Sequence, residues 1–152
     1  SSLPINQVLK RVGKFNKERI SELNIIGQDI SGYGIDLYAK RSLPELLKKI
    51  AKLADNIGWI RLLYLYPGAI VNEIIELMKN EPKICRYIDL PIQHINDKIL
   101  KLMNRRTSKK DILELIQRIR KELPDAAIRT SLIVGFPLET DKEFKELLNF
   151  VQ

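Results

Sequence analysis

The sequence is poor in the residues that bind metals and in the long apolar runs that cross membranes. It has one cysteine, Cys85, and one histidine, His94, in 152 residues. A lone cysteine can form no internal disulfide and cannot supply the three or four thiolates of an iron–sulfur cluster. No apolar run approaches the roughly 20 residues that span a bilayer, and no signal-peptide pattern is present. We therefore expect no metal site and no membrane contact, and a reducing cytoplasm as the location.

Common catalytic and nucleotide-binding patterns are also missing. The sequence contains no serine-centred elbow, no P-loop and no complete dinucleotide fingerprint. Its 26 Lys and Arg against 19 Asp and Glu give a formal charge of +7, which favours polyanionic partners such as RNA or a ribosome. The densest basic stretch, residues 98–110, is typical of either a solvated helix face or a nucleic-acid contact.

Short apolar runs alternate with segments of helical periodicity along the whole chain. We expect strands at 23–26, 59–66, 87–92 and 128–136, the last buried on both faces because its run is continuously apolar or β-branched. The expected helices cover 4–13 with a continuation toward 20, 42–57, 71–78, 98–104, 109–123 and 142–151. Their expected caps are Ser2, Ser42, Asn72 or an earlier residue, Asn96, Ser108 and Thr140.

This alternation predicts an α/β fold built from parallel βα units. Four strands are few for a closed barrel, and the chain starts and stops on a helix. We therefore expect residues 1–152 to form one incomplete domain, a partial parallel (β/α) barrel with four strands and flanking helices, cut from a larger protein. An open flavodoxin-like sheet is the alternative. Exposed strand edges on such a slice predict self-association.

Polar residues and glycines gather where each predicted strand ends, and ligands of α/β folds bind at that edge. The candidates are Gly27, Gln28 and Asp29, then Tyr64 and Tyr66, then Asp89, Gln93 and His94, and finally Arg129, Thr130 and Gly135. A buried Asp89 needs a partner, and either Arg61 or Arg129 can supply it. Arg129 is equally suited to a ligand carboxylate.

Four segments in this order resemble the radical S-adenosylmethionine methylthiotransferases: IIGQDISGYG, RLLYLYP, YIDLPIQHINDKILKLMNRR and RTSLIVGFPLET. The family has a branch that modifies an aspartate of a small-subunit ribosomal protein (the RimO type) and a branch that modifies tRNA adenosine. GQD after the first strand, YLYP at the second and QH after the third are more similar to the ribosomal-protein branch. The tRNA branch remains the alternative.

The resemblance implies a radical S-adenosylmethionine barrel, similar to a TIM barrel, of which this chain supplies strands two to five. It implies S-adenosylmethionine binding, with Gly27, Gln28 and Asp29 at the methionyl amino group. Asp89, Pro91 and Gln93 correspond to residues near the ribose and methionyl group. Arg129 and Thr130 correspond to residues near the carboxylate. Residues from Ile133 to Gly135 correspond to those that flank adenine.

The chain departs from the family in several places, and it lacks the amino-terminal domain, the sixth barrel strand and the carboxy-terminal β domain. The C-x3-C-x2-C motif that holds the family's [4Fe–4S] cluster precedes the first helix, and none of it is present here. We therefore expect the cluster in a full-length parent, no catalytic residue in this chain and no activity of the chain alone. Leu138 replaces the glycine of the family's GFPGET turn. A non-catalytic α/β module binding RNA or another ligand, and a degenerate paralogue, are the other hypotheses.

Overall fold

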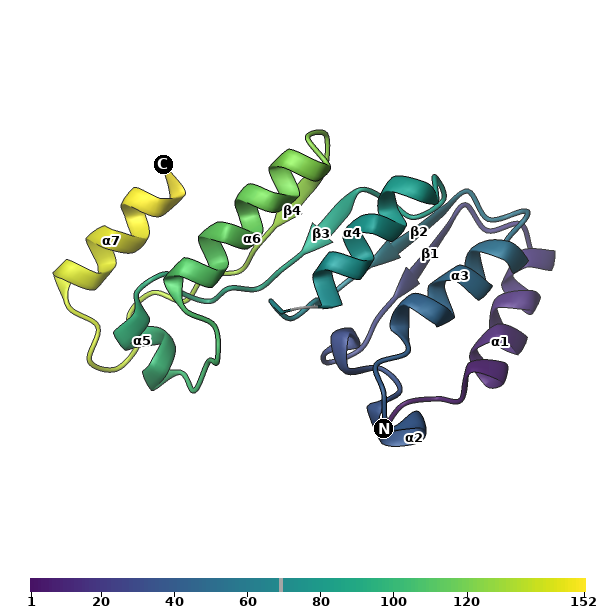
Figure 1. Ribbon diagram of the computed structural model, residues 1–152, viewed down its shortest axis with the longest axis horizontal. Helices are drawn as coiled ribbons and strands as arrows, with labels where there is room; N and C mark the ends of the chain where they lie inside the picture. Colours follow the sequence, from purple (N-terminus) through teal and green to yellow (C-terminus); the bar gives the residue numbers. More distant parts are fainter. Residues whose placement is uncertain (69) are drawn as a thin grey trace.

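Four parallel strands lie side by side in chain order in the computed structural model, which describes residues 1–68 and 70–152 (Figure 1). They are β1 (Glu22–Ile25), β2 (Trp59–Leu62), β3 (Tyr87–Asp89) and β4 (Ala127–Arg129). β1 pairs with β2 and β3 with β4, both in parallel. A bridge between Ile60 and Ile84 and a 2.9 Å hydrogen bond from the Leu65 N–H to the Asp89 carbonyl join the two pairs.

Helices connect the strands and form a row in which neighbours touch in the order α1, α3, α4 and α6. Figure 1 places α1 at one end of the molecule and α7 at the other. The helical segments are α1 (Ile5–Lys17), the 3-10 turn η1 (Ile30–Gly32), α2 (Ile35–Tyr38), α3 (Leu43–Leu53), α4 (Ile70–Asn80), α5 (Asp97–Leu102), α6 (Lys109–Glu122) and α7 (Asp141–Val151).

The two faces of the sheet differ in chemistry. On one face Ile60, Leu62 and Ile88 are fully buried and belong to the apolar core that the helices complete. Side chains alternate along a strand, so the residues between them point to the other face. There Glu22 and Arg61 form a two-pronged ion pair, with Nε–Oε1 at 2.6 Å and Nη2–Oε2 at 3.0 Å. The uncovered face is therefore polar and half-exposed.

The strand order confirms the partial barrel. A flavodoxin-like sheet reverses its strand order near the middle and carries helices on both faces. The described strands follow one another without a reversal, and the helix row packs against one face. Consecutive parallel βα units of this kind are the elements of a (β/α) barrel.

The regular strands are shorter than the sequence predicts. The second was expected to reach Tyr66 but ends at Leu62, because Tyr64 adopts a φ of +61° that interrupts the pleat. The third was expected to reach Ile92 but ends at Asp89, and Gln93 beyond it has a φ of +70°.

The prediction that the fourth strand is buried on both faces is wrong. Regular β structure covers only Ala127–Arg129, and Ile133 and Val134 are 41% and 61% exposed. Within the described part of the chain, β4 pairs with β3 alone, so its second edge has no partner. Among residues 1–68 and 70–152, the helices cover one face of the sheet and leave the other open.

Three of the predicted helix caps are correct. Asn96 accepts from the backbone N–H groups of Lys98 and Ile99, and Ser108 and Thr140 each form a capping box with the third helical residue.

The other three cap predictions have different outcomes. Ser42 is the N-cap residue of α3, as predicted, but its hydroxyl donates to the Lys40 carbonyl and makes no capping hydrogen bond. The prediction of Ser2 is wrong, because Pro4 is the residue that precedes α1. Asn72 lies inside α4, which begins at Ile70, and the alternative of an earlier cap residue falls outside the described residues.

The turn before α7 carries local strain. Leu138 has a φ of +69°, a region that disfavours every residue with a Cβ atom, and its side chain is 70% exposed. The departure from the family's glycine at this position therefore has a structural consequence.

We predict that Leu138→Gly stabilises the protein by about 0.5–1 kcal/mol, because the strain removed exceeds the added entropy of the unfolded chain. Urea unfolding followed by circular dichroism measures the change. Gly135→Ala is the matched control: Gly135 has a φ of +75° with open space around a Cβ atom, so this substitution should destabilise through the backbone alone. A loss of stability in Leu138→Gly would contradict the assignment of strain.

Candidate functional site

A chain of hydrogen bonds crosses the carboxyl edge of all four strands. The Asp89 side chain is fully buried. Its Oδ1 accepts from Arg129 Nη1 at 2.7 Å, and its Oδ2 accepts from the Tyr64 N–H at 3.1 Å. The Tyr64 carbonyl in turn accepts from the Ile30 N–H at 3.4 Å. Of the two partners predicted for Asp89, Arg129 is therefore the correct one, and Arg61 pairs with Glu22 instead.

Arg129 is held by this contact but stays accessible. Its side chain is 50% exposed, and Asp89 is its one hydrogen-bond partner among the described residues. The Asp89 carboxylate raises the pKa of Arg129 above its ordinary value, with smaller contributions from Tyr87 and Tyr64. The guanidinium is thus oriented and charged, with further N–H groups available to an anion.

The end of the first strand lines a cleft of about 750 Å³ between α1 and β1. Gly27, Gln28 and Asp29 all line it, and the side chains of the last two are exposed. The Asp29 carboxylate accepts from the Ser31 N–H at 2.8 Å and so caps η1. The cleft does not include the predicted residues from β3 onward.

Hydrogen bonds beyond the ends of β3 and β4 continue the pairing of these two strands. The Thr130 hydroxyl donates to the Leu90 carbonyl at 2.9 Å and accepts from the Ile92 N–H at 3.3 Å. The Gln93 N–H donates to the Ser131 carbonyl at 3.0 Å, and the Gln93 carbonyl accepts from Ile133 at 2.8 Å. The hydroxyl of Thr130 is therefore used by the fold itself.

The residues next to this pairing are partly or fully accessible to solvent. Pro91 and the Gln93 side chain are half-buried, and Ile133 and Gly135 are exposed. Apart from Gly135 and its two chain neighbours, no described residue has a heavy atom within 4 Å of the place a Cβ atom would take on Gly135, so a ligand can approach this backbone closely.

The chemistry of these residues suits S-adenosylmethionine. An amide and a carboxylate at the first strand end match an ammonium group, and a half-exposed guanidinium at the fourth matches a carboxylate. Apolar Ile133 beside the accessible backbone of Gly135 matches a planar base. The described residues do not suit an iron–sulfur cluster, because no three His, Cys, Asp or Glu side chains among them converge. Cys85 is half-buried, and burial raises the pKa of its thiol.

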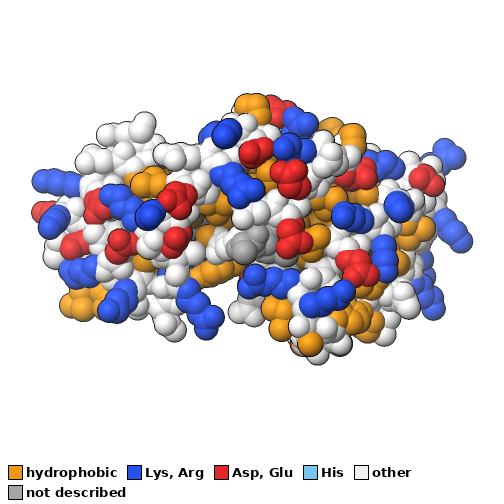
Figure 2. Space-filling model, in the orientation of Figure 1, with side chains coloured by type: hydrophobic (Ala, Val, Ile, Leu, Met, Phe, Trp, Pro, Cys, Tyr) orange, Lys and Arg blue, Asp and Glu red, His pale blue; other side chains and the backbone are white. Residues whose placement is uncertain are grey.

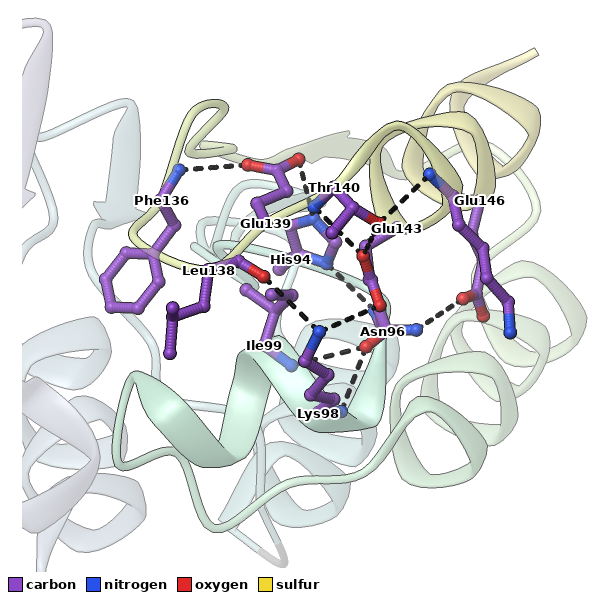
Figure 3. A network of polar contacts seen from close by, with 11 residues as sticks. His94, Asn96, Lys98, Ile99, Phe136, Leu138, Glu139, Thr140, Glu143 and Glu146 are labelled. Carbon is purple, nitrogen blue, oxygen red and sulfur yellow. Dashed lines mark hydrogen bonds and ion pairs between the residues drawn. The ribbon is translucent and has the colours of Figure 1, made fainter.

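A second polar network, around the fully buried His94, joins the loop before α5 to the turn before α7 (Figure 3). Nδ1 of His94 accepts from the Asn96 N–H at 2.9 Å, so Nε2 carries the proton that faces Glu139 Oε1 at 3.4 Å. Burial raises the pKa of Glu139, but the Phe136 N–H and His94 outweigh it, and the pKa lies below its ordinary value. His94 is thus a buried structural residue.

The network continues onto α7. Lys98 Nζ contacts Glu143 Oε1 at 3.1 Å, and Asn96 Nδ2 donates to Glu146 Oε2 at 2.6 Å. Lys109 Nζ also reaches Glu146, at 2.6 Å. Sequence reasoning missed Glu139 and Glu146. The spacing of Thr140 and Glu143 is the capping-box pattern and could have identified Glu143.

Half of the six basic side chains in the predicted stretch form ion pairs with residues that the structure describes. Lys98, Lys109 and Lys110 pair with Glu143, Glu146 and Glu114. The Arg105 guanidinium lies 5.7 Å from the centre of the Tyr66 ring. Figure 2 shows acidic and basic side chains interspersed on the face it presents. The structure favours a solvated, salt-bridged surface over a continuous positive patch.

The fold and the edge together define a class. A parallel half-barrel presents a guanidinium, an amide, a carboxylate and open backbone at the carboxyl ends of its strands, as enzymes and ligand-binding domains of the (β/α) barrel type do. The sequence matches the radical SAM superfamily over residues 1–151, and the chain belongs to that superfamily. Membership implies S-adenosylmethionine and a [4Fe–4S] cluster as the cofactors.

Two proteins with the same name are similar to this chain over almost all of its length. A protein of Geotalea uraniireducens named ribosomal protein uS12 methylthiotransferase RimO is 49% identical over 151 residues, and one of the same name from Geobacter sulfurreducens is 50% identical. Each match covers 99% of this chain and 34% of the relative, so the chain spans about a third of the length of these proteins.

A solved structure of archaeal Elp3 from Methanocaldococcus infernus shares the fold, with a TM-score of 0.53 and 21% identity. The match covers 96% of this chain and 37% of the Elp3 chain.

Within the described residues, none of the helices has the length and apolarity that crossing a bilayer requires.

The Glu143 contacts predict a response to acid. The Thr140 hydroxyl and N–H, with Lys98, lower the pKa of Glu143 from 4.5 to about 2. A carboxylate with a lowered pKa in the folded state stabilises fully above its unfolded pKa, and this contribution is lost as the pH falls from about 4.5 toward 2.

We predict that the free energy of unfolding falls more steeply between pH 4.5 and pH 2 in the unmodified protein than in Glu143→Gln. Urea unfolding at several pH values measures both slopes. Glu114→Gln removes the same charge from an exposed pair on α6 and is the control, which should keep the original slope. Equal slopes for the unmodified protein and Glu143→Gln would contradict the role assigned to this carboxylate.

Proposed function

We propose that this chain is the S-adenosylmethionine-binding part of a longer methylthiotransferase that modifies an aspartate of the small-subunit ribosomal protein uS12. The observation that carries the proposal is the identity of about half over nearly the whole chain to proteins of that name. A cytoplasmic location follows from a ribosomal substrate. The cluster ligands and the substrate-binding parts then belong to the longer protein, with residues 1–152 as one incomplete barrel domain.

Within this proposal, different residues of the carboxyl edge bind different groups of the cofactor. Gln28 and Asp29 bind the methionyl ammonium group beside the backbone of Gly27, and Arg129 binds the carboxylate. Ile133 and the backbone of Gly135 flank the adenine. When bound, S-adenosylmethionine supplies the methyl group and the adenosyl group of the reaction.

Three predicted residues act in this proposal through the protein rather than directly on the cofactor. Asp89 is fully buried and both its oxygens are engaged, so it orients Arg129. Thr130 closes the backbone pairing of the third and fourth strand ends. Pro91 lies in the same pairing, and the half-buried Gln93 side chain remains free to reach the ribose.

The substrate is tested with the full-length protein carrying its cluster. Incubation with uS12, S-adenosylmethionine, a sulfide source and a reductant should add a methylthio group to one aspartate, seen by mass spectrometry of uS12 peptides. Unmodified tRNA in a parallel reaction should stay unmodified. Methylthiolation of tRNA adenosine with no change to uS12 would overturn the substrate assignment and favour the tRNA branch.

The role of Gln28 gives a separate prediction for binding. We expect Gln28→Ala in the full-length protein to weaken S-adenosylhomocysteine binding about tenfold, the effect of one hydrogen bond to a charged group, without changing the melting temperature. Isothermal titration calorimetry measures the affinity. Gln117→Ala on the exposed face of α6 is the matched control and should bind normally. Unchanged affinity in Gln28→Ala would remove Gln28 from the site.

A further inference from the structure

Tyr64 combines a costly backbone conformation with an exposed aromatic ring. Its φ of +61° lies in the left-handed region, which glycine adopts freely and bulky side chains adopt rarely. Its side chain is 44% exposed, so packing in the core does not account for a tyrosine here. Residues held in such conformations cluster at functional sites, where the surrounding structure enforces them.

The contacts of Tyr64 explain what enforces the conformation. Its N–H donates to Asp89 Oδ2 at 3.1 Å while its carbonyl accepts from the Ile30 N–H at 3.4 Å. The Tyr64 peptide groups therefore connect the loop after β1 to the buried carboxylate on β3. Because that carboxylate holds Arg129 at 2.7 Å, the backbone of Tyr64 helps to set the spacing between Gln28–Asp29 and Arg129.

The backbone conformation at Tyr64 does not require an aromatic side chain, so the ring needs another explanation. A glycine would keep both backbone hydrogen bonds at this φ with less strain. The Tyr64 hydroxyl forms no hydrogen bond with any residue that the structure describes. The Tyr64 N–H and the Arg129 guanidinium bind the two oxygens of the same carboxylate, that of Asp89. The ring is thus an exposed apolar surface on a residue that shares this carboxylate with an oriented, half-exposed guanidinium.

We propose that Tyr64 is a further residue of the S-adenosylmethionine site, in which its backbone positions Asp89 and Arg129 and its ring packs against the bound cofactor. An aromatic ring next to the guanidinium that binds the carboxylate excludes water from that ion pair and strengthens it. The proposal rests on the cofactor site described above. It is independent of whether uS12 or tRNA is the substrate.

Three variants in the full-length, cluster-loaded protein separate the ring from the backbone. Tyr64→Leu keeps a side chain with the same backbone constraint and removes the ring. Tyr64→Phe keeps the ring and removes only the hydroxyl. Tyr64→Asn tolerates the left-handed conformation and lacks a ring, so it replaces Tyr64→Leu if that variant does not fold. Calorimetric titration with S-adenosylhomocysteine gives the affinity, and thermal denaturation without ligand gives the stability.

We expect Tyr64→Leu, or Tyr64→Asn in its place, to bind about tenfold more weakly with a melting temperature near that of the unmodified protein. Tyr64→Phe should bind within twofold of it. Affinity within twofold for the variant without a ring would overturn the proposal. An equal loss in Tyr64→Phe would also overturn it, because the ring would then contribute nothing without its hydroxyl. Neither result bears on the identity of the methylthiolated substrate, which is read from mass spectrometry of uS12.

Discussion

The buried carboxylate of Asp89 is the contact on which the functional edge depends. It lies on the polar, uncovered face of the sheet and is nevertheless fully buried, because Arg129 and the chain at Tyr64 close over it. A buried charge is costly unless it is paired and hydrogen-bonded. The Asp89 carboxylate therefore holds the chain beyond β2 and the Arg129 guanidinium on β4 in a fixed relation. Together with the hydrogen bond between Tyr64 and Ile30, it connects the ends of all four strands.

The division between the two faces of the sheet explains why the surface is available. Helices α1, α3, α4 and α6 pack side by side against the apolar face and supply the core. The opposite face carries the ion pair between Glu22 and Arg61 and the stacked contact of Arg61 with the Tyr87 ring, 4.6 Å from its centre. The polar contacts of the sheet therefore lie on the face that the helices of the described chain leave uncovered.

The sequence predicted the order of strands and helices because apolar periodicity is a local property. It limited the partner of Asp89 to Arg61 or Arg129, because a buried carboxylate has few possible partners, and the structure selects Arg129. It could not predict where the strands end. The left-handed residues Tyr64 and Gln93 stop the pleat, and both are held by contacts with distant parts of the chain. The buried network of His94 and Glu139 was missed for the same reason, because its residues are 45 positions apart.

A crystal structure of the full-length protein with S-adenosylhomocysteine tests the central claim most directly, because it shows whether the carboxyl edge is the cofactor site. The account predicts that the ligand carboxylate contacts Arg129, that Gln28 contacts the amino group and that Asp89 remains paired beneath them. A ligand bound on another surface, with Arg129 facing only protein, would contradict the account.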